Sequence, residues 1–183
     1  YVVTKATGGQ KLHIKIQETI YHPGHYRVAQ AVNSPTELPP DPQVTTRDSE
    51  RGPWSVSALI QNPAQVPVLA DGLFVHSTRP TGQMEPFETD VQVPNINCKK
   101  CTLQVIQFMA EHAFNNPGGY SYHHCADLQI TADPSKPLDR GWPAERGDLR
   151  RNGQPRVCEG HRPWDLRVRL RFGDAFTVER RAV

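Results

Sequence analysis

"KLHIKIQET", at residues 11–19, is the stretch that decides the fold. Its apolar side chains recur at every second position, at Leu12, Ile14 and Ile16, and the positions between them are polar or charged. Successive side chains of a β-strand point to opposite faces, so this alternation predicts a half-buried strand with one face in a core. Gly8 and Gly9 supply a turn in front of it.

Further strand-like runs follow along the chain and are separated by loops. Most of the 17 prolines and 13 glycines fall between these runs, where they interrupt strands and block helices. We therefore predict an all-β fold, a β-sandwich of the immunoglobulin or fibronectin type III kind with long loops. The runs are residues 25–32, 54–60, 73–77, 87–93, 101–109 and 120–131.

The composition changes after residue 135. We assign residues 1–135 to the sandwich and residues 136–183 to a C-terminal extension rich in proline, glycine and arginine. The first part carries 9 basic and 12 acidic side chains, whereas the extension carries 12 basic and 7 acidic ones. Within the extension, "WDLRVRLRF" at 164–172 alternates like the run at 11–19 and predicts one added strand.

Several classes of protein are disfavoured by what the sequence lacks. The basic extension has no interleaved aromatic residues of a nucleic-acid module, so we expect no nucleic-acid partner. No apolar run approaches the roughly 20 residues of a membrane span, so we expect no membrane partner. A glycine-rich phosphate loop and a GxSxG elbow are also missing, which argues against phosphate and serine-hydrolase chemistry. We expect a monomer.

The four cysteines are typical of a secreted or periplasmic β-domain with one or two disulfides. Three complete pairings are possible, and the sequence does not choose among them. A zinc site built on "CKKC" with His124 or Cys125 is an alternative, but it lacks a second close ligand pair. A Cys125–His124 nucleophile is disfavoured because neighbouring side chains of a strand point apart. The cysteines are Cys98, Cys101, Cys125 and Cys158.

Two clusters of histidine and tyrosine lie far apart in the sequence and suggest a single site. "ETIYHPGHYR" at 18–27 places His22 and His25 in a Pro-Gly turn directly after a strand. "GGYSYHHCADLQI" at 118–130 places a second histidine pair at another junction of turn and strand. Imidazoles at such positions are suited to transition metals. We interpret His13 and His76 as surface residues.

Together with "CKKCTLQVIQFM", these two stretches resemble the lytic polysaccharide monooxygenases and their relatives in the chitin-binding type-4-like superfamily. The similarity covers roughly residues 10–132 and is greatest to a bacterial, polysaccharide-monooxygenase-like subgroup. The matching positions are Thr19, His22, Gly24 and His25-Tyr26, then Cys98, Cys101, Leu103 and Gln104, and finally Tyr122, Cys125, Ala126, Asp127 and Leu128.

The resemblance implies a mononuclear copper site. His22 matches the internal equatorial ligand of the family's histidine brace, and Tyr122 matches its axial residue, so these two would be the catalytic positions. The implied reaction is reduction of the copper, activation of O2 or H2O2 and hydrogen abstraction from a glycosidic C–H bond. It implies a chitin- or cellulose-type polysaccharide and an external electron donor as partners. The residues expected around the copper site are His25, His112, Tyr120 and His124.

Two departures from the family pattern bear on activity. Tyr1 stands first where the family begins with the other histidine of the brace, so we expect a chain that lacks its N-terminal segment and is impaired as an oxygenase. Tyr120 stands where the family often has glutamine, two residues before the axial position. The alternative is a non-catalytic, secreted sandwich that binds glycan or copper. A purely structural interpretation also remains open, in which His22 is an ordinary turn histidine and Tyr122 an ordinary core residue.

Overall fold

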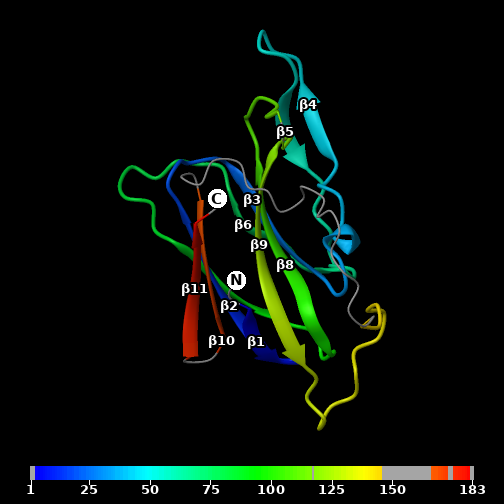
Figure 1. Cartoon of the computed structure of the whole chain (residues 1–183). Coiled ribbons are helices and arrows are strands. Elements are labelled where there is room, and N and C mark those ends of the chain that lie inside the picture. Colours follow the sequence, from blue (N-terminus) through cyan, green and yellow to red (C-terminus); the bar gives the residue numbers. More distant parts are fainter. Residues whose placement is uncertain (1–2, 117, 146–165, 173–174, 182–183) are drawn as a thin grey trace.

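The protein, here a computed structural model, is described over residues 3–116, 118–145, 166–172 and 175–181 (Figure 1). Over these ranges it consists of β-strands and one short 3-10 helix, η1 (Pro35–Glu37), with no α-helix. The strands are β1 (Thr4–Thr7), β2 (Lys11–Glu18), β3 (Gly24–Ala31), β4 (Val44–Arg47), β5 (Trp54–Ala58), β6 (Val68–His76), β7 (Phe87–Gln92), β8 (Cys98–Met109), β9 (Ser121–Thr131), β10 (Leu166–Phe172) and β11 (Ala175–Arg181).

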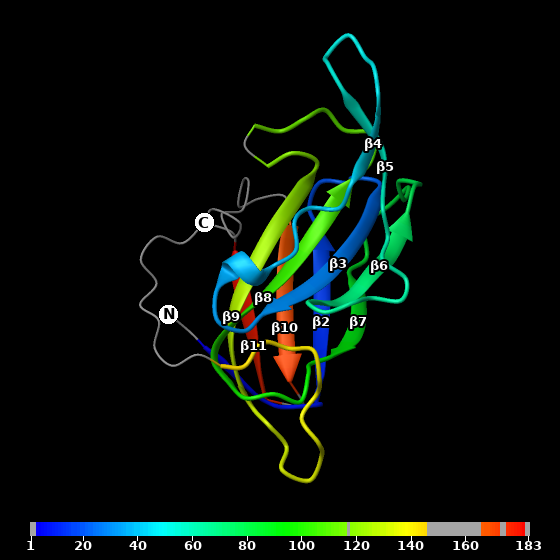
Figure 2. The ribbon, with the colours of Figure 1, turned by 90° about the vertical axis from the view of Figure 1, so that its right-hand side faces the viewer.

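The strands form two sheets that face one another, which confirms the predicted all-β sandwich. One sheet has the order β1-β9-β8-β3-β6 and the other the order β11-β10-β2-β7. Figure 2 shows the second sheet lying behind the first, with β10 and β2 at its centre. A separate hairpin of β4 and β5 projects beyond one end of the sandwich.

The core lies between the sheets and follows the alternation seen in the sequence. Leu12, Ile14 and Ile16 of β2 are completely buried, as predicted. They belong to one apolar cluster with residues of the facing sheet, such as Val28 on β3 and Leu128 on β9. Burial of side chains of this size stabilises the fold by about 1.5–3 kcal/mol each.

A strand from the C-terminal region is part of this sandwich. β10 pairs with β2 along its whole length, from Leu166 opposite Glu18 to Phe172 opposite Leu12. Val168, Leu170 and Phe172 are buried in the core, as the alternation of residues 164–172 predicts. β11 continues the sheet beyond β10 and was not predicted, nor were the short strands β1 and β4.

The structure decides one of the cysteine pairings left open by the sequence. Cys98 and Cys101 form a disulfide at the start of β8, with their Cα atoms 5.8 Å apart. Cys125 on β9 is also disulfide-bonded, and Cys158 lies outside the described residues. Oxidised sulfurs are not zinc ligands, so "CKKC" is not a zinc site. Disulfides form and persist in oxidising compartments. In the described ranges, no helix has the length and apolar character of a membrane span.

We predict that Leu170→Ala lowers the free energy of unfolding by about 2–5 kcal/mol, because it leaves a cavity between the sheets. Arg171→Ala, one position along the same strand, removes an exposed side chain and should change it by less than about 0.5 kcal/mol. Urea unfolding of the two variants measures both values. Equal, small effects would mean that β10 does not pack into the core.

Candidate metal site

His22 lies in the turn between β2 and β3, and three contacts hold this turn in place. The His76 ring donates through Nε2 to the His22 carbonyl oxygen (2.8 Å), and the Ala110 amide donates to the Pro23 carbonyl oxygen (2.7 Å). Gly24 then lies so close to β8 that a Cβ atom on it would sit 1.9 Å from the Phe108 carbonyl oxygen. A residue without a side chain is therefore needed where β3 begins. His22, just before this position, is 92% buried.

His112 lies in the loop that joins β8 to β9, and Ser55 of the projecting hairpin anchors this loop. The Ser55 hydroxyl donates to the carbonyl oxygen of Met109 (2.7 Å), and its amide donates to the carbonyl oxygen of His112 (2.9 Å). The Glu111 amide in turn donates to the Ser55 carbonyl oxygen (2.9 Å). These bonds fix the backbone at His112, although the residue lies outside any strand.

The turn, the loop and β9 bring three of the predicted site residues together. The His22 ring makes edge contacts with the rings of His112 and Tyr122, at centroid separations of 5.1 Å and 5.5 Å. A metal–nitrogen bond of about 2 Å places an imidazole centroid roughly 3 Å from the metal, so two rings on one ion have centroids at most roughly 6 Å apart. The His22–His112 pair satisfies this limit.

The donor set fits a copper ion in type, with two imidazoles and a phenol. The His112 ring donates through Nδ1 to the Ala113 carbonyl oxygen (2.7 Å), which in the neutral ring leaves the lone pair on Nε2. Imidazole suits copper, and such a bond to the other ring nitrogen is typical of metal-binding histidines. Within the described residues, no three His, Cys, Asp or Glu side chains are grouped for a metal ion. A metal at His22 would thus rely on His112 and Tyr122.

The other residues expected around the site lie elsewhere. His25 is on β3 and packs against Phe108, with its Nε2 4.0 Å from the Asp71 carboxylate. Tyr120 lies further along the loop, where its ring contacts Phe114 and its hydroxyl donates to the Pro53 carbonyl oxygen (3.0 Å). His124 follows Tyr122 on β9 at a spacing of two and lies opposite Val105 of β8.

Burial changes the protonation of the two off-site histidines. It lowers the pKa of His124 to about 4, and the neighbouring His123 lowers it further in the same direction. Burial also lowers the pKa of His25, although the Asp71 carboxylate acts against this. Both rings are therefore neutral near pH 7, and neither adds positive charge beside His22.

A buried polar network behind His22 was missed by the sequence analysis. Glu18 ends β2 with its side chain only 2% exposed. Its Oε1 accepts hydrogen bonds from the Tyr26 hydroxyl (2.5 Å) and from Nε2 of Gln107 (2.6 Å). The same oxygen lies 3.2 Å from Nε2 of His76. The alternation of β2 carried a signal, because Glu18 occupies the same face as Leu12, Ile14 and Ile16.

His76 is not the surface residue that the sequence analysis proposed. Its two ring nitrogens face the carbonyl oxygens of Phe74 (2.7 Å) and His22 (2.8 Å), and a carbonyl can only accept, so both nitrogens carry a proton. Burial by itself lowers the pKa of His76, but the bonds to Glu18 and to these carbonyls outweigh it and raise the pKa above its usual value. His76 and Glu18 thus form a buried ion pair directly behind His22.

Comparison with known proteins adds no family to this picture. No protein-family model matches the chain, and a search of curated proteins returned no match. The resemblance to lytic polysaccharide monooxygenases therefore rests on the sequence motifs quoted above.

We predict that His124 makes stability fall as the pH drops from about 6.5 towards 4. In this window the unfolded chain binds a proton that the folded chain does not, so the free energy of unfolding decreases, by up to about 3 kcal/mol for this shift. His76 has the opposite effect on stability. Because its pKa is raised in the folded chain, its contribution to the free energy of unfolding is present at low pH and is lost as the pH rises through that pKa.

Comparing His124→Gln with the natural chain isolates the effect of His124 from that of His76. Urea unfolding at pH 7 and pH 4.5 should show a smaller acid loss of stability in the variant. Identical losses in both proteins would contradict a buried, neutral His124.

Proposed function

We propose that this protein is a secreted or periplasmic copper-binding β-sandwich of the lytic polysaccharide monooxygenase type, acting on a polysaccharide of the chitin or cellulose kind. The observation that carries the proposal is the contact of the His22 ring with both His112 and Tyr122. These rings come from three separate segments of the chain, and imidazole is a ligand that suits copper. The Cys98–Cys101 disulfide supports an oxidising compartment.

Each residue has a distinct role in this proposal. His22 and His112 would hold the metal, and Tyr122 would contribute its phenol beside them. The His76 ring orients the turn by its hydrogen bond to the His22 carbonyl oxygen. Copper bound there, once reduced by an external electron donor, would supply the activation of O2 or H2O2 that precedes attack on a glycosidic C–H bond. The buried protein side of the site keeps water from the rings, since His22 and Tyr122 are only 8% and 7% exposed.

A second candidate, a sandwich that binds glycan without chemistry, is favoured by one separate observation. Phe114, two residues after His112, is 60% exposed, and the Tyr120 ring makes an edge contact with it. Sugar rings stack on exposed aromatic faces. The loop that carries His112 therefore also presents an aromatic surface for a polysaccharide, and this surface serves either candidate.

Copper binding separates the two candidates. We expect Cu(II) to bind this chain, and His22→Ala and His112→Ala each to raise the dissociation constant by about tenfold or more, because each removes one of two imidazoles. Calorimetry measures the affinity, and electron paramagnetic resonance should show fewer nitrogen couplings in both variants. His13→Ala, on the opposite sheet and bonded to Asp90 (2.9 Å), is the matched control and should bind like the natural chain. Unchanged binding in His112→Ala would refute this metal site.

Polysaccharide binding tests the aromatic surface. Phe114→Ala should weaken adsorption to insoluble chitin or cellulose by about three- to tenfold, the loss expected for one stacking contact. Leu59→Ala removes another exposed apolar side chain, from the segment after β5, and is the control. Depletion from suspensions of each polysaccharide measures the effect. Equal adsorption of the natural chain and Phe114→Ala would exclude Phe114 from the binding surface.

A further inference from the structure

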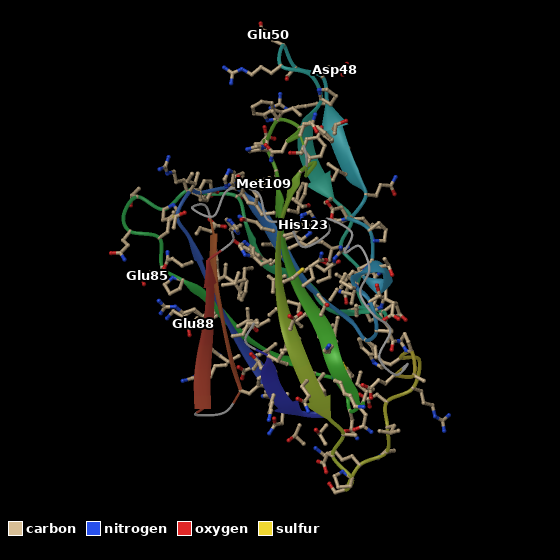
Figure 3. The ribbon with its side chains drawn as sticks, viewed as in Figure 1. Asp48, Glu50, Glu85, Glu88, Met109 and His123 are labelled. Atoms are coloured by element: carbon tan, nitrogen blue, oxygen red, sulfur yellow. A yellow bond between two sulfur atoms is a disulfide. The ribbon has the colours of Figure 1, made fainter. Side chains whose placement is uncertain are left out.

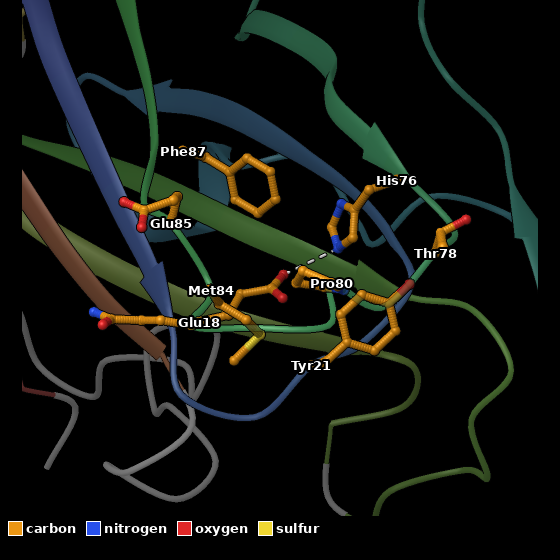
Figure 4. A pocket seen from close by; sticks show the side chains of 9 residues that line it. Glu18, Tyr21, His76, Thr78, Pro80, Met84, Glu85 and Phe87 are labelled. Carbon is orange, nitrogen blue, oxygen red and sulfur yellow. Dashed lines mark ion pairs between the residues drawn. The ribbon is translucent and has the colours of Figure 1, made fainter.

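A cavity of about 280 Å³ is lined in part by His76, the residue that donates to the His22 carbonyl oxygen (Figure 4). It opens between the end of β2, the Tyr21 turn and the segment that leads into β7. Tyr21, Met84 and Phe87 give it largely apolar walls, and Gln17 fastens one wall by donating to the Met84 carbonyl oxygen (2.7 Å). Small-molecule sites have this character, concave and apolar with a few polar groups.

One polar atom at this cavity is buried without a partner among the described residues, and a carboxylate oxygen beside it is not used by the network. The contacts of Glu18 with Tyr26, Gln107 and His76 all go to Oε1, so Oε2 can accept a further hydrogen bond. The Tyr21 hydroxyl is the buried atom without a hydrogen-bond partner. Buried polar atoms are normally satisfied, and an unsatisfied one costs free energy. A ligand with a hydrogen-bond donor would satisfy the Glu18 oxygen.

The charges around the cavity select a cation. Glu18 lies at its inner end and the exposed Glu85 at its rim, while His76 supplies one positive charge. No lysine or arginine is among the described residues that line it. The lining is therefore negative overall, and the aromatic faces of Tyr21 and Phe87 add a favourable surface for positive charge.

We propose that this cavity binds a small organic cation, an ammonium group on an apolar body. The ammonium donates to Glu18 Oε2, and the apolar body lies against Met84 and Phe87. Figure 4 shows the Glu18 carboxylate turned inward towards His76, with Phe87 and Tyr21 on either side. Two carboxylates repel an anionic ligand of the same shape, and a neutral one leaves the negative charge of the lining uncompensated.

Three probes of one shape and different charge test the proposal: phenethylammonium, 2-phenylethanol and 3-phenylpropionate. Each is titrated into the full chain and followed by calorimetry and by amide chemical shifts. All titrations contain EDTA, so the result does not depend on copper and a failure of the copper proposal is seen separately. Phenethylammonium should bind saturably, at least about tenfold more tightly than the alcohol, the difference expected for one hydrogen bond to a charged group. The carboxylate should not bind.

Variants of the lining locate the site. Glu18→Gln should weaken phenethylammonium binding by about tenfold or more, with its folding checked by thermal unfolding. Two variants leave the Glu18 network untouched: Glu85→Gln should weaken binding by about two- to fivefold, and Met84→Trp should abolish it by filling the cavity. Glu50→Gln, at the tip of the β4–β5 hairpin (Figure 3), is the control and should bind like the natural chain.

Three results would overturn the proposal. One is the absence of saturable phenethylammonium binding at millimolar concentration. Another is equal affinity for the ammonium and the alcohol, which would make the charge irrelevant. The third is unchanged affinity in Met84→Trp, because the probe would then bind outside the cavity whatever the fate of Glu18→Gln.

Discussion

The buried carboxylate of Glu18 is the constraint on which the rest of the structure depends. It belongs to β2 of one sheet, and its Oε1 meets Tyr26, Gln107 and His76, which lie on three strands of the other. A charge removed from water costs several kcal/mol unless its partners compensate, and removing one partner from a buried pair costs about 3–5 kcal/mol. The main core cluster between the sheets is made of apolar side chains, whose contacts carry little direction. At Glu18 the contacts are directional, so they set how the two sheets lie relative to one another at this end of the sandwich.

The candidate metal site takes its geometry from this network. A row of neighbouring residues crosses the sheet from Tyr26 on β3 through Gln107 on β8 to Tyr122 on β9. The first two donate hydrogen bonds to Glu18, and the third is the phenol of the candidate metal site. His76 extends the network to the His22 carbonyl oxygen. The same imidazolium lines the cavity behind the turn. The metal site and the cavity therefore share one residue, and a change in the position of His76 would reach both.

Loops complete the site on the side away from the network. The loop that holds His112 and Phe114 has no strand structure of its own at His112, yet the hydrogen bonds to Ser55 tie it to the hairpin of β4 and β5. Binding residues are commonly found on loops held by a rigid scaffold. Here the hairpin is the scaffold for one imidazole and one exposed aromatic ring, while the sandwich supplies the other imidazole and the phenol. This division explains why His112 contacts His22 although the two residues are 90 positions apart in the chain.

The sequence alone determined the strands that alternate and the face that each one buries. Leu12, Ile14 and Ile16, and later Val168, Leu170 and Phe172, have a period of two that depends only on backbone geometry, so their burial could be predicted. The motifs around His22 and Tyr122 also indicated that these two rings belong together. Only the tertiary structure decided which other histidines join them. His112 reached the site and His25 did not, and His76 moved from an expected surface position to a buried ion pair. Alternation places a side chain on a face but says nothing of what lies opposite, because the partner comes from a strand far along the chain. Gln107, for example, is 89 residues from Glu18, and only the packing of one sheet on the other brings them within 2.6 Å.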